Sequence, residues 1–148
     1  MNSPVADAKV EDLVAEFVKH QSLEIAAQER EDTSSANRHF DKMYAVVKKL
    51  GNSQTGRSAL EQLMSHVLPE VRLRAAGQVM SWAPEKAIPV LGRLVAEWRP
   101  KDPRKGYVAV RFEAAGWLYD YFSIKDFDHN KLIEPLRAYG IDLPRRPE

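Results

Sequence analysis

Apolar residues recur at intervals of three and four along most of this 148-residue chain, which is the pattern of amphipathic helices. Val10, Leu13, Val14 and Phe17 form one such stripe and predict a first helix over about residues 8–29. The alternation of apolar and polar residues that marks a half-buried strand is absent. We therefore expect an all-α protein.

Similar stripes continue toward the C-terminus. The second stripe comprises Phe40, Met43, Tyr44, Val47 and Leu50, and the third comprises Leu60, Leu63, Met64 and Val67. Later helices are predicted to begin at Pro69 and end near Trp82, to begin at Pro84, and to cover about residues 107–122 and 128–140. This makes about six to seven helices.

Capping residues mark several of the helix ends. Thr33, Ser34 or Ser35 can cap the second helix, Gly51 can end it, and Ser53 can cap the third.

Prolines and glycines mark ends nearer the C-terminus. Pro89 lies awkwardly within the fifth helix and predicts either a kink or a true start near Ala87. Asp128 can cap the last helix and Gly140 can close it, after which residues 141–148 are expected to be extended and mobile.

One phrase occurs twice, 39 positions apart. Residues 71–82 read VRLRAAGQVMSW, and residues 110–121 read VRFEAAGWLYDY. Each copy follows another amphipathic helix, so the repeating unit is a helical hairpin that must stack on a neighbour to bury its apolar stripe. We expect the small residues Ala75–Gly77 and Ala114–Gly116 to lie where the two hairpins meet.

Residues 54–122 resemble HEAT repeats, through the run LPEVRLRAAGQVMSWAPEKAIPVLGRL and its second copy. The resemblance implies a short right-handed α-solenoid of antiparallel helical hairpins, in which the second helices line a concave face. The length of the chain and its helical patterning predict one all-α domain over residues 1–148. Its predicted parts are an N-terminal helical pair (1–52), two HEAT-like hairpins (53–122), a C-terminal capping helix (123–140) and a tail (141–148).

A looser resemblance covers residues 10–97, which include NRHFDKMYAVVKKL and the hairpin that follows. This part is similar to a family of small, functionally uncharacterised bacterial helical proteins. Some members of such families are similar to immunity proteins that neutralise partner toxins. The chain departs from that pattern after residue 97, where the segment RPKDPRKGYVAVRFEAAGWLYDY is added.

Charge is segregated along the chain, although the formal net charge is only +1. Residues 1–32 carry a net charge of −5, residues 33–111 carry +8, and residues 112–148 carry −2. Such asymmetry fits either a surface for a charged partner or the packing of an acidic helix on a basic middle segment. There is no cysteine, which excludes disulfides, thiol catalysis and thiolate metal sites.

The chain lacks the motifs of the common catalytic and metal sites, so we expect no enzymatic activity, no cofactor and no metal. Asp126, Asp128 and Asn130 match positions 1, 3 and 5 of a calcium loop. Lys131 stands where that loop needs glycine, and Arg137 stands where it needs glutamate. A capped, solvated turn explains these residues better.

The arginines at matching positions of the two copies, Arg72 and Arg111, admit two interpretations. In HEAT-like repeats the equivalent arginine bridges neighbouring hairpins. Alternatively, the two arginines form a ladder of bases facing a phosphate backbone. The loop bases Arg99, Lys101, Arg104 and Lys105 would extend that ladder.

The leading hypothesis is a non-enzymatic protein-binding module that grips another protein through its concave face. The resemblance to immunity proteins implies a cognate toxin as the most specific form of that partner. The residues predicted to contact the partner are Arg74, Trp82, Arg104, Lys105, Glu113, Trp117 and Tyr121. The alternative is nucleic-acid binding through the basic middle segment. No membrane span or signal peptide is apparent in the sequence, so a cytoplasmic location is expected.

Overall fold

The computed structural model describes residues 4–97 and 105–147, and this part of the chain is all-α. It forms seven α-helices and one 3₁₀ helix, η1, with no strand. The helices are α1 (Pro4–Glu29), α2 (Thr33–Leu50), α3 (Gln54–Leu63), α4 (Pro69–Val79), α5 (Pro84–Ala96), α6 (Lys105–Tyr121) and α7 (Ile133–Arg137), with η1 at His129–Leu132. None of the described helices has both the length and the apolar character needed to cross a membrane.

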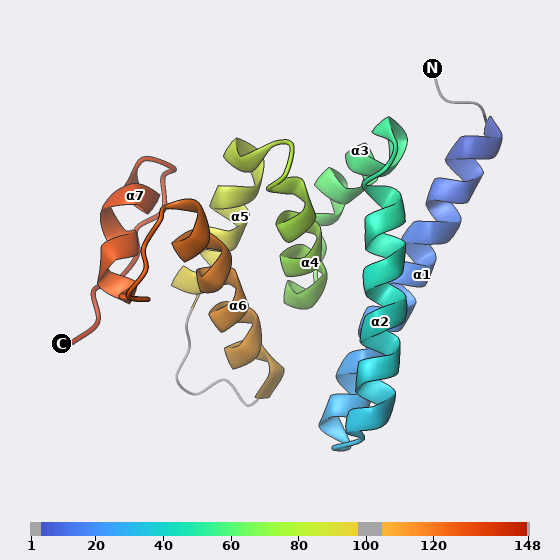
Figure 1. Cartoon of the computed structure of the whole chain (residues 1–148), viewed down its shortest axis with the longest axis horizontal. Coiled ribbons are helices and arrows are strands. Elements are labelled where there is room, and N and C mark those ends of the chain that lie inside the picture. The colour runs from blue at the N-terminus through green and yellow to red at the C-terminus, as the bar shows by residue number, and fades with distance from the viewer. Residues whose placement is uncertain (1–3, 98–104, 148) are drawn as a thin grey trace.

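The helices follow one another across the molecule in chain order (Figure 1). The long helices α1 and α2 pack against each other at one end, and α7 lies at the other end. Contacts join α2 to α3, α3 to α4, α4 to α5 and α5 to α6. A further contact joins α4 directly to α6, so the two copies of the repeated phrase lie side by side.

Side-chain caps begin three of the helical segments. Ser53 caps α3 by accepting a hydrogen bond from the Gly56 amide at 3.0 Å, as predicted. Asp128 likewise caps η1 by accepting from the Asn130 amide at 3.0 Å. The predicted cap of α2 is wrong, because Asp32 is the capping residue and its carboxylate accepts from the Ser35 amide at 3.1 Å.

Two glycines lie near the end of α2, and the structure requires one of them for close packing rather than for an unusual backbone conformation. Gly51 has a φ of −66°, which any residue can adopt. The next glycine, Gly56, allows α3 to approach the end of α2 closely, because a Cβ there would lie 2.0 Å from the Leu50 carbonyl oxygen. The sharp turn between these helices therefore depends on Gly56.

The apolar stripes form one core that runs through the helix contacts, with a few exceptions at helix ends. Phe17, Met43 and Leu60 are fully buried, as their stripes predicted. Val67 is 84% exposed, because α3 ends at Leu63 and the chain turns before reaching it. Tyr44 is 44% exposed, so the second stripe is only partly core.

Two helix boundaries near the middle of the chain differ from prediction. Helix α5 begins at Pro84 and continues through Pro89, so the alternative start near Ala87 is wrong. Helix α4 ends at Val79 rather than near Trp82, and residues 80–82 form a turn.

The C-terminal segment is held to the body of the protein, so the prediction of a mobile tail is wrong for most of it. Ile141 and Leu143 are buried in the core. The His129 ring donates from Nε2 to the Pro144 carbonyl oxygen at 3.0 Å. Asn130 donates to the Arg146 carbonyl oxygen at 3.0 Å and accepts from the Arg146 amide at 2.8 Å.

The seam between α4 and α6 confirms the predicted small-residue contact in α4 and contradicts part of it in α6. Ala75, Ala76 and Gly77 are all buried, and so is Ala114. Gly116 is exposed, and a Cβ there would meet no atom within 4 Å. Helix α4 has neighbours on several sides, whereas α6 is covered on fewer, so equivalent positions receive different environments.

Candidate functional site

Four of the predicted partner-binding residues lie together on α4 and α6. These are Arg74, Glu113, Trp117 and Tyr121. Arg74 and Trp117 border a hollow between α2, α4 and α6, Trp117 and Tyr121 border a second hollow between α4 and α6, and Glu113 contacts Arg74. Trp82 is not part of this group, because its indole contacts the region of α3: Nε1 lies 3.5 Å from Glu61 Oε2, and Arg57 stacks at 4.9 Å. Arg104 and the side chain of Lys105 lie outside the described residues.

Arg74 and Glu113 occupy the same position in the two copies of the repeat, and they form an ion pair with each other. Arg74 donates from Nη1 to Glu113 Oε2 and from Nη2 to Oε1, the second at 3.5 Å. Each copy thus supplies one of the two opposite charges that hold α4 to α6. The guanidinium also lies 5.1 Å from the centre of the Phe40 ring, which ties α2 to the same point.

Two buried carboxylates surround this ion pair. Glu24 on α1 and Glu70 on α4 are only 5% and 6% exposed. Burial raises the pKa of Glu24, and the positive charge of Arg74 opposes that shift. Gln28 donates from Nε2 to Glu24 Oε1 at 3.1 Å. Arg74 therefore contacts α6 through Glu113 and α2 through Phe40, and its positive charge lies near the buried carboxylate of Glu24 on α1.

The prediction that Arg72 bridges neighbouring hairpins is not supported by the contacts of its Nε. In the described part of the chain the buried Nε of Arg72 makes no hydrogen bond. The bridge between the repeated helices is made two residues later, by Arg74. Its matching position, Arg111, lines a separate cavity on the far side of α6.

Trp117 lies directly over Gly77, in the seam between the repeated helices. A Cβ on Gly77 would lie 3.0 Å from Cε2 and Cζ2 of the indole, so the glycine provides the room that the ring occupies. Together with Phe40 and Tyr44 on α2, Trp117 borders a small hollow of about 60 Å³. Tyr121 borders a wider hollow of about 320 Å³ beside it.

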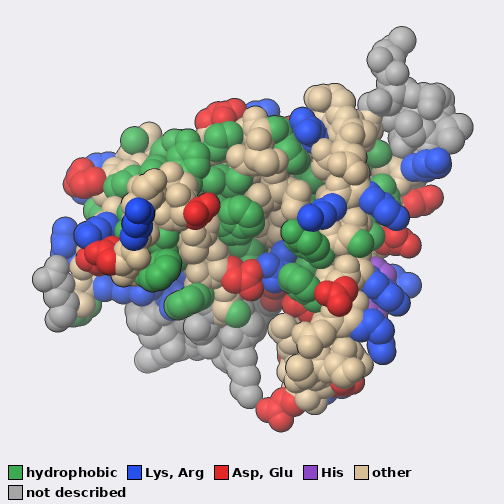
Figure 2. Space-filling model, in the orientation of Figure 1, with side chains coloured by type: hydrophobic (Ala, Val, Ile, Leu, Met, Phe, Trp, Pro, Cys, Tyr) green, Lys and Arg blue, Asp and Glu red, His purple; other side chains and the backbone are tan. Residues whose placement is uncertain are grey.

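We call this surface, formed by Phe40, Tyr44, Trp117 and Tyr121 around the Arg74–Glu113 pair, the aromatic face. Trp117 and Tyr121 are 41% and 46% exposed. Figure 2 shows hydrophobic side chains on the side of the molecule that carries α2, α4 and α6, with acidic and basic side chains between them. The sequence missed Phe40 and Tyr44, because their helical spacing is that of core residues.

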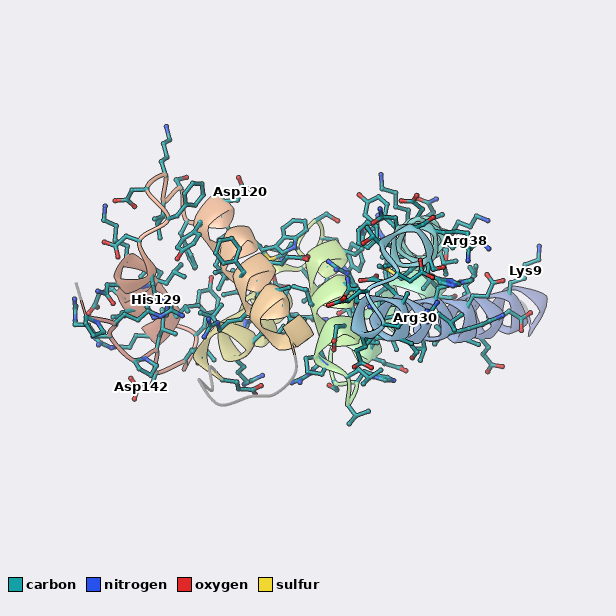
Figure 3. All side chains as sticks on the ribbon, turned by 90° about the horizontal axis from the view of Figure 1, so that it is seen from below. Lys9, Arg30, Arg38, Asp120, His129 and Asp142 are labelled. Atoms are coloured by element: carbon teal, nitrogen blue, oxygen red, sulfur yellow. The ribbon has the colours of Figure 1, made fainter. Side chains whose placement is uncertain are left out.

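A histidine pair joins α1 to α2. His20 and His39 stack with ring centres 5.4 Å apart, and their Nδ1 atoms lie 3.2 Å apart. Burial lowers the pKa of both rings, and nearby cations lower it further. Figure 3 shows this end of the molecule, where Arg30 and Arg38 are labelled.

The described residues contain no group of three or more His, Cys, Asp or Glu side chains that could hold a metal ion. In the acidic turn that resembles a calcium loop, two of the carboxylates already bind groups of the protein itself. Lys131 donates to the Asp126 carboxylate, and Asp128 caps η1. These contacts favour the interpretation of this segment as a capped turn.

The family comparison matches residues 11–102 to a model described as "Domain of unknown function (DUF2019)". The chain belongs to the DUF2019 family. No curated protein and no solved structure matches it. The DUF2019 domain spans nearly the same residues as the looser resemblance seen in the sequence, 10–97, and it includes α2 to α5 and most of α1. Helix α6 lies beyond it, so the Arg74–Glu113 pair joins the DUF2019 domain to the segment that follows.

Proposed function

We propose that this DUF2019 protein is a non-enzymatic protein-binding module that contacts its partner through the aromatic face. The observation that carries the proposal is the placement of Trp117, whose half-exposed indole is seated on Gly77 beside a fixed arginine. Tryptophan, tyrosine and arginine are the residues that most often dominate binding energy at protein interfaces. Here they lie next to one another around shallow hollows.

The rigidity of this surface also supports the proposal. The Arg74 side chain is only 17% exposed, forms an ion pair with Glu113 and lies over the Phe40 ring. A preorganised surface loses less conformational entropy on binding than a mobile one. The aromatic face can therefore use more of its contact energy for affinity.

We propose further that the helices stack as a short right-handed HEAT-like solenoid, with the aromatic face on its concave side. The contacts between successive helices support this arrangement, as does the burial of Val71 with its counterpart Val110 and of Val79 with its counterpart Leu118. Toxin neutralisation is the most specific form of the proposed function, and it rests on the resemblance to immunity proteins.

The test compares the chain with three variants as immobilised bait at physiological salt, in a lysate of its source cells. Trp117→Ala and Tyr121→Ala remove the exposed rings, and Val67→Ala is the matched control because Val67 is exposed outside the aromatic face. The expected partner binds the native chain and Val67→Ala equally. Trp117→Ala should raise its dissociation constant about 30-fold, the effect of losing about 2 kcal/mol at a hot spot.

A partner that binds both ring-deleted variants as tightly as the native chain would refute the assignment to this face. Circular dichroism of each variant separates loss of binding from loss of folding. Retention on random duplex DNA that falls steeply with salt would instead favour the nucleic-acid alternative. If the captured protein is toxic to cells, co-expression of the chain should restore their growth.

A further inference from the structure

A second cavity lies along another side of α6 and shares only Glu113 with the aromatic face. It has a volume of about 470 Å³ and is bounded by α6, the end of α5 and the C-terminal segment. Figure 3 shows the C-terminal segment, with His129 labelled, on one side of α6 and α4 on the other. Phe112, Gly116 and Tyr119 recur at the spacing of one helix face and form its α6 wall. The volume is within the range of cavities that bind small organic ligands.

The walls of this cavity are mainly apolar, and Phe112, Tyr119 and Phe127 contribute aromatic rings to them. Phe112 and Phe127 are 80% and 72% exposed, although large apolar side chains are ordinarily buried. The backbone of Phe127 has a φ of 54°, a left-handed conformation that bulky residues rarely adopt. Its ring meets Tyr119 edge to face, with centres 5.7 Å apart. A strained residue with an exposed ring at a cavity is typical of a functional site.

The C-terminal segment places a positively charged side chain, that of Arg146, at the cavity. Two hydrogen bonds to Asn130 fix the Arg146 backbone, and the bond from His129 to the Pro144 carbonyl oxygen fixes the residues before it. Arg146 then lines the cavity together with Arg111 and His129. These contacts explain why a segment without regular secondary structure is nonetheless held in place.

Cationic side chains contribute to the wall of this cavity, since Arg146 and Arg111 are among the residues that line it. Burial lowers the pKa of His129, and the charges of Arg146 and Arg111 lower it further, against the opposing effect of its bond to Pro144. His129 is therefore neutral at pH 7. The lining carboxylate, Glu113, is already paired with Arg74. Asp128, the next acid along the segment, has its side chain engaged in capping η1.

We propose that this cavity binds an organic monoanion with a flat apolar body, such as an aryl carboxylate. The aromatic side chains would hold the apolar body, and Arg146 would face the carboxylate, for which its planar guanidinium group is suited. This cavity shares only Glu113 with the aromatic face, and the two assignments can fail independently because none of the cavity variants changes a residue of that face.

The test titrates 2-naphthoate into the full chain by calorimetry. It is compared with 2-naphthalenemethanol, which lacks the charge, and with 2-naphthylmethylamine, which reverses it. The acid is expected to bind at least tenfold more tightly than either. Bound carboxylate should also raise the pKa of His129, followed by NMR of its ring protons, because a negative charge stabilises imidazolium.

Three variants test whether 2-naphthoate binds in this cavity. Arg146→Gln should weaken 2-naphthoate binding about tenfold or more, whereas Arg145→Gln, at the neighbouring position outside the lining, should not. Gly116→Leu places a side chain in the cavity and should abolish binding while raising the thermal midpoint, since leucine favours a helix over glycine. Opposite changes in stability and binding exclude simple unfolding.

A tripeptide ending in phenylalanine, with a free or an amidated C-terminus, distinguishes a protein chain end from a small molecule as the source of the carboxylate. If only the tripeptide with the free C-terminus competes with 2-naphthoate, the natural ligand is the end of a protein chain. If neither tripeptide competes, the natural ligand is a small molecule. The proposal is overturned if 2-naphthoate does not bind at millimolar concentration. It is equally overturned if the alcohol binds as tightly, or if Arg146→Gln leaves binding unchanged.

Discussion

Gly77 and Gly116 hold the same position in the two copies of the repeat, yet replacing each with alanine should have opposite effects. Alanine is favoured over glycine inside a helix by about 0.5–1 kcal/mol. At Gly116 a Cβ meets no atom within 4 Å, so Gly116→Ala should gain that full amount. The difference in stability between Gly77→Ala and Gly116→Ala then measures how the side chains around Gly77 tolerate the added methyl group.

At Gly77 the new Cβ would lie 3.0 Å from Cε2 and Cζ2 of Trp117 and 3.1 Å from Nε1. The favourable separation between carbon atoms is about 3.5–4.0 Å, so the indole must move. Overpacking of this kind costs about 1–3 kcal/mol, and the half-exposed indole can yield outward, which indicates the lower end. Gly77→Ala should therefore gain nothing or lose up to about 1 kcal/mol.

Urea unfolding followed by circular dichroism measures both effects, through the midpoint at constant slope. The two variants should differ by about 1–2 kcal/mol in the free energy of unfolding. In a Trp117→Ala background the conflict disappears, and adding Gly77→Ala should then stabilise by about 0.5–1 kcal/mol. Equal stabilisation by Gly77→Ala and Gly116→Ala in the native background would refute the contact between Gly77 and Trp117.

Two further predictions concern the charges around Arg74. A double-mutant cycle with Arg74→Gln and Glu113→Gln should give a coupling free energy of up to about 1 kcal/mol. The exposed Arg137–Glu134 pair on α7 is the control, and its coupling free energy should be only about 0.3–0.5 kcal/mol. Equal coupling free energies for the two pairs would contradict the role assigned to Arg74. Because burial raises the pKa of Glu24, the folded state holds the extra proton, and this contribution to stability is lost as pH rises above about 4.5 through the raised value. In urea unfolding, Glu24→Gln should therefore be more stable than the native chain at pH 7, and this difference in stability should shrink toward pH 4.5. A variant that is less stable than the native chain at pH 7 would show that the partners of Glu24 stabilise its charge more than burial destabilises it.

The number and order of the helices followed from local chemistry that the sequence displays directly. Apolar spacing marked each helix, while Ser53, Pro69 and Pro84 marked helix starts. The error at the start of α2 was small, since Asp32 and the three residues after it are all capable caps and local sequence hardly separates them. The error at the tail was larger, because the contacts that hold it come from Asn130 and from the core, far from it in sequence.

The repeat by itself determined that two similar helices exist and that small residues allow them to approach. Only the tertiary structure decided that the copies would have different roles. Among the described residues, Trp117 covers Gly77 and no side chain covers Gly116, and Leu73 is buried where Phe112 is 80% exposed. Periodicity records which side of a helix is apolar, but burial depends on how many neighbours surround that helix. Helix α4 is enclosed and α6 is not, and both candidate sites arise from that difference.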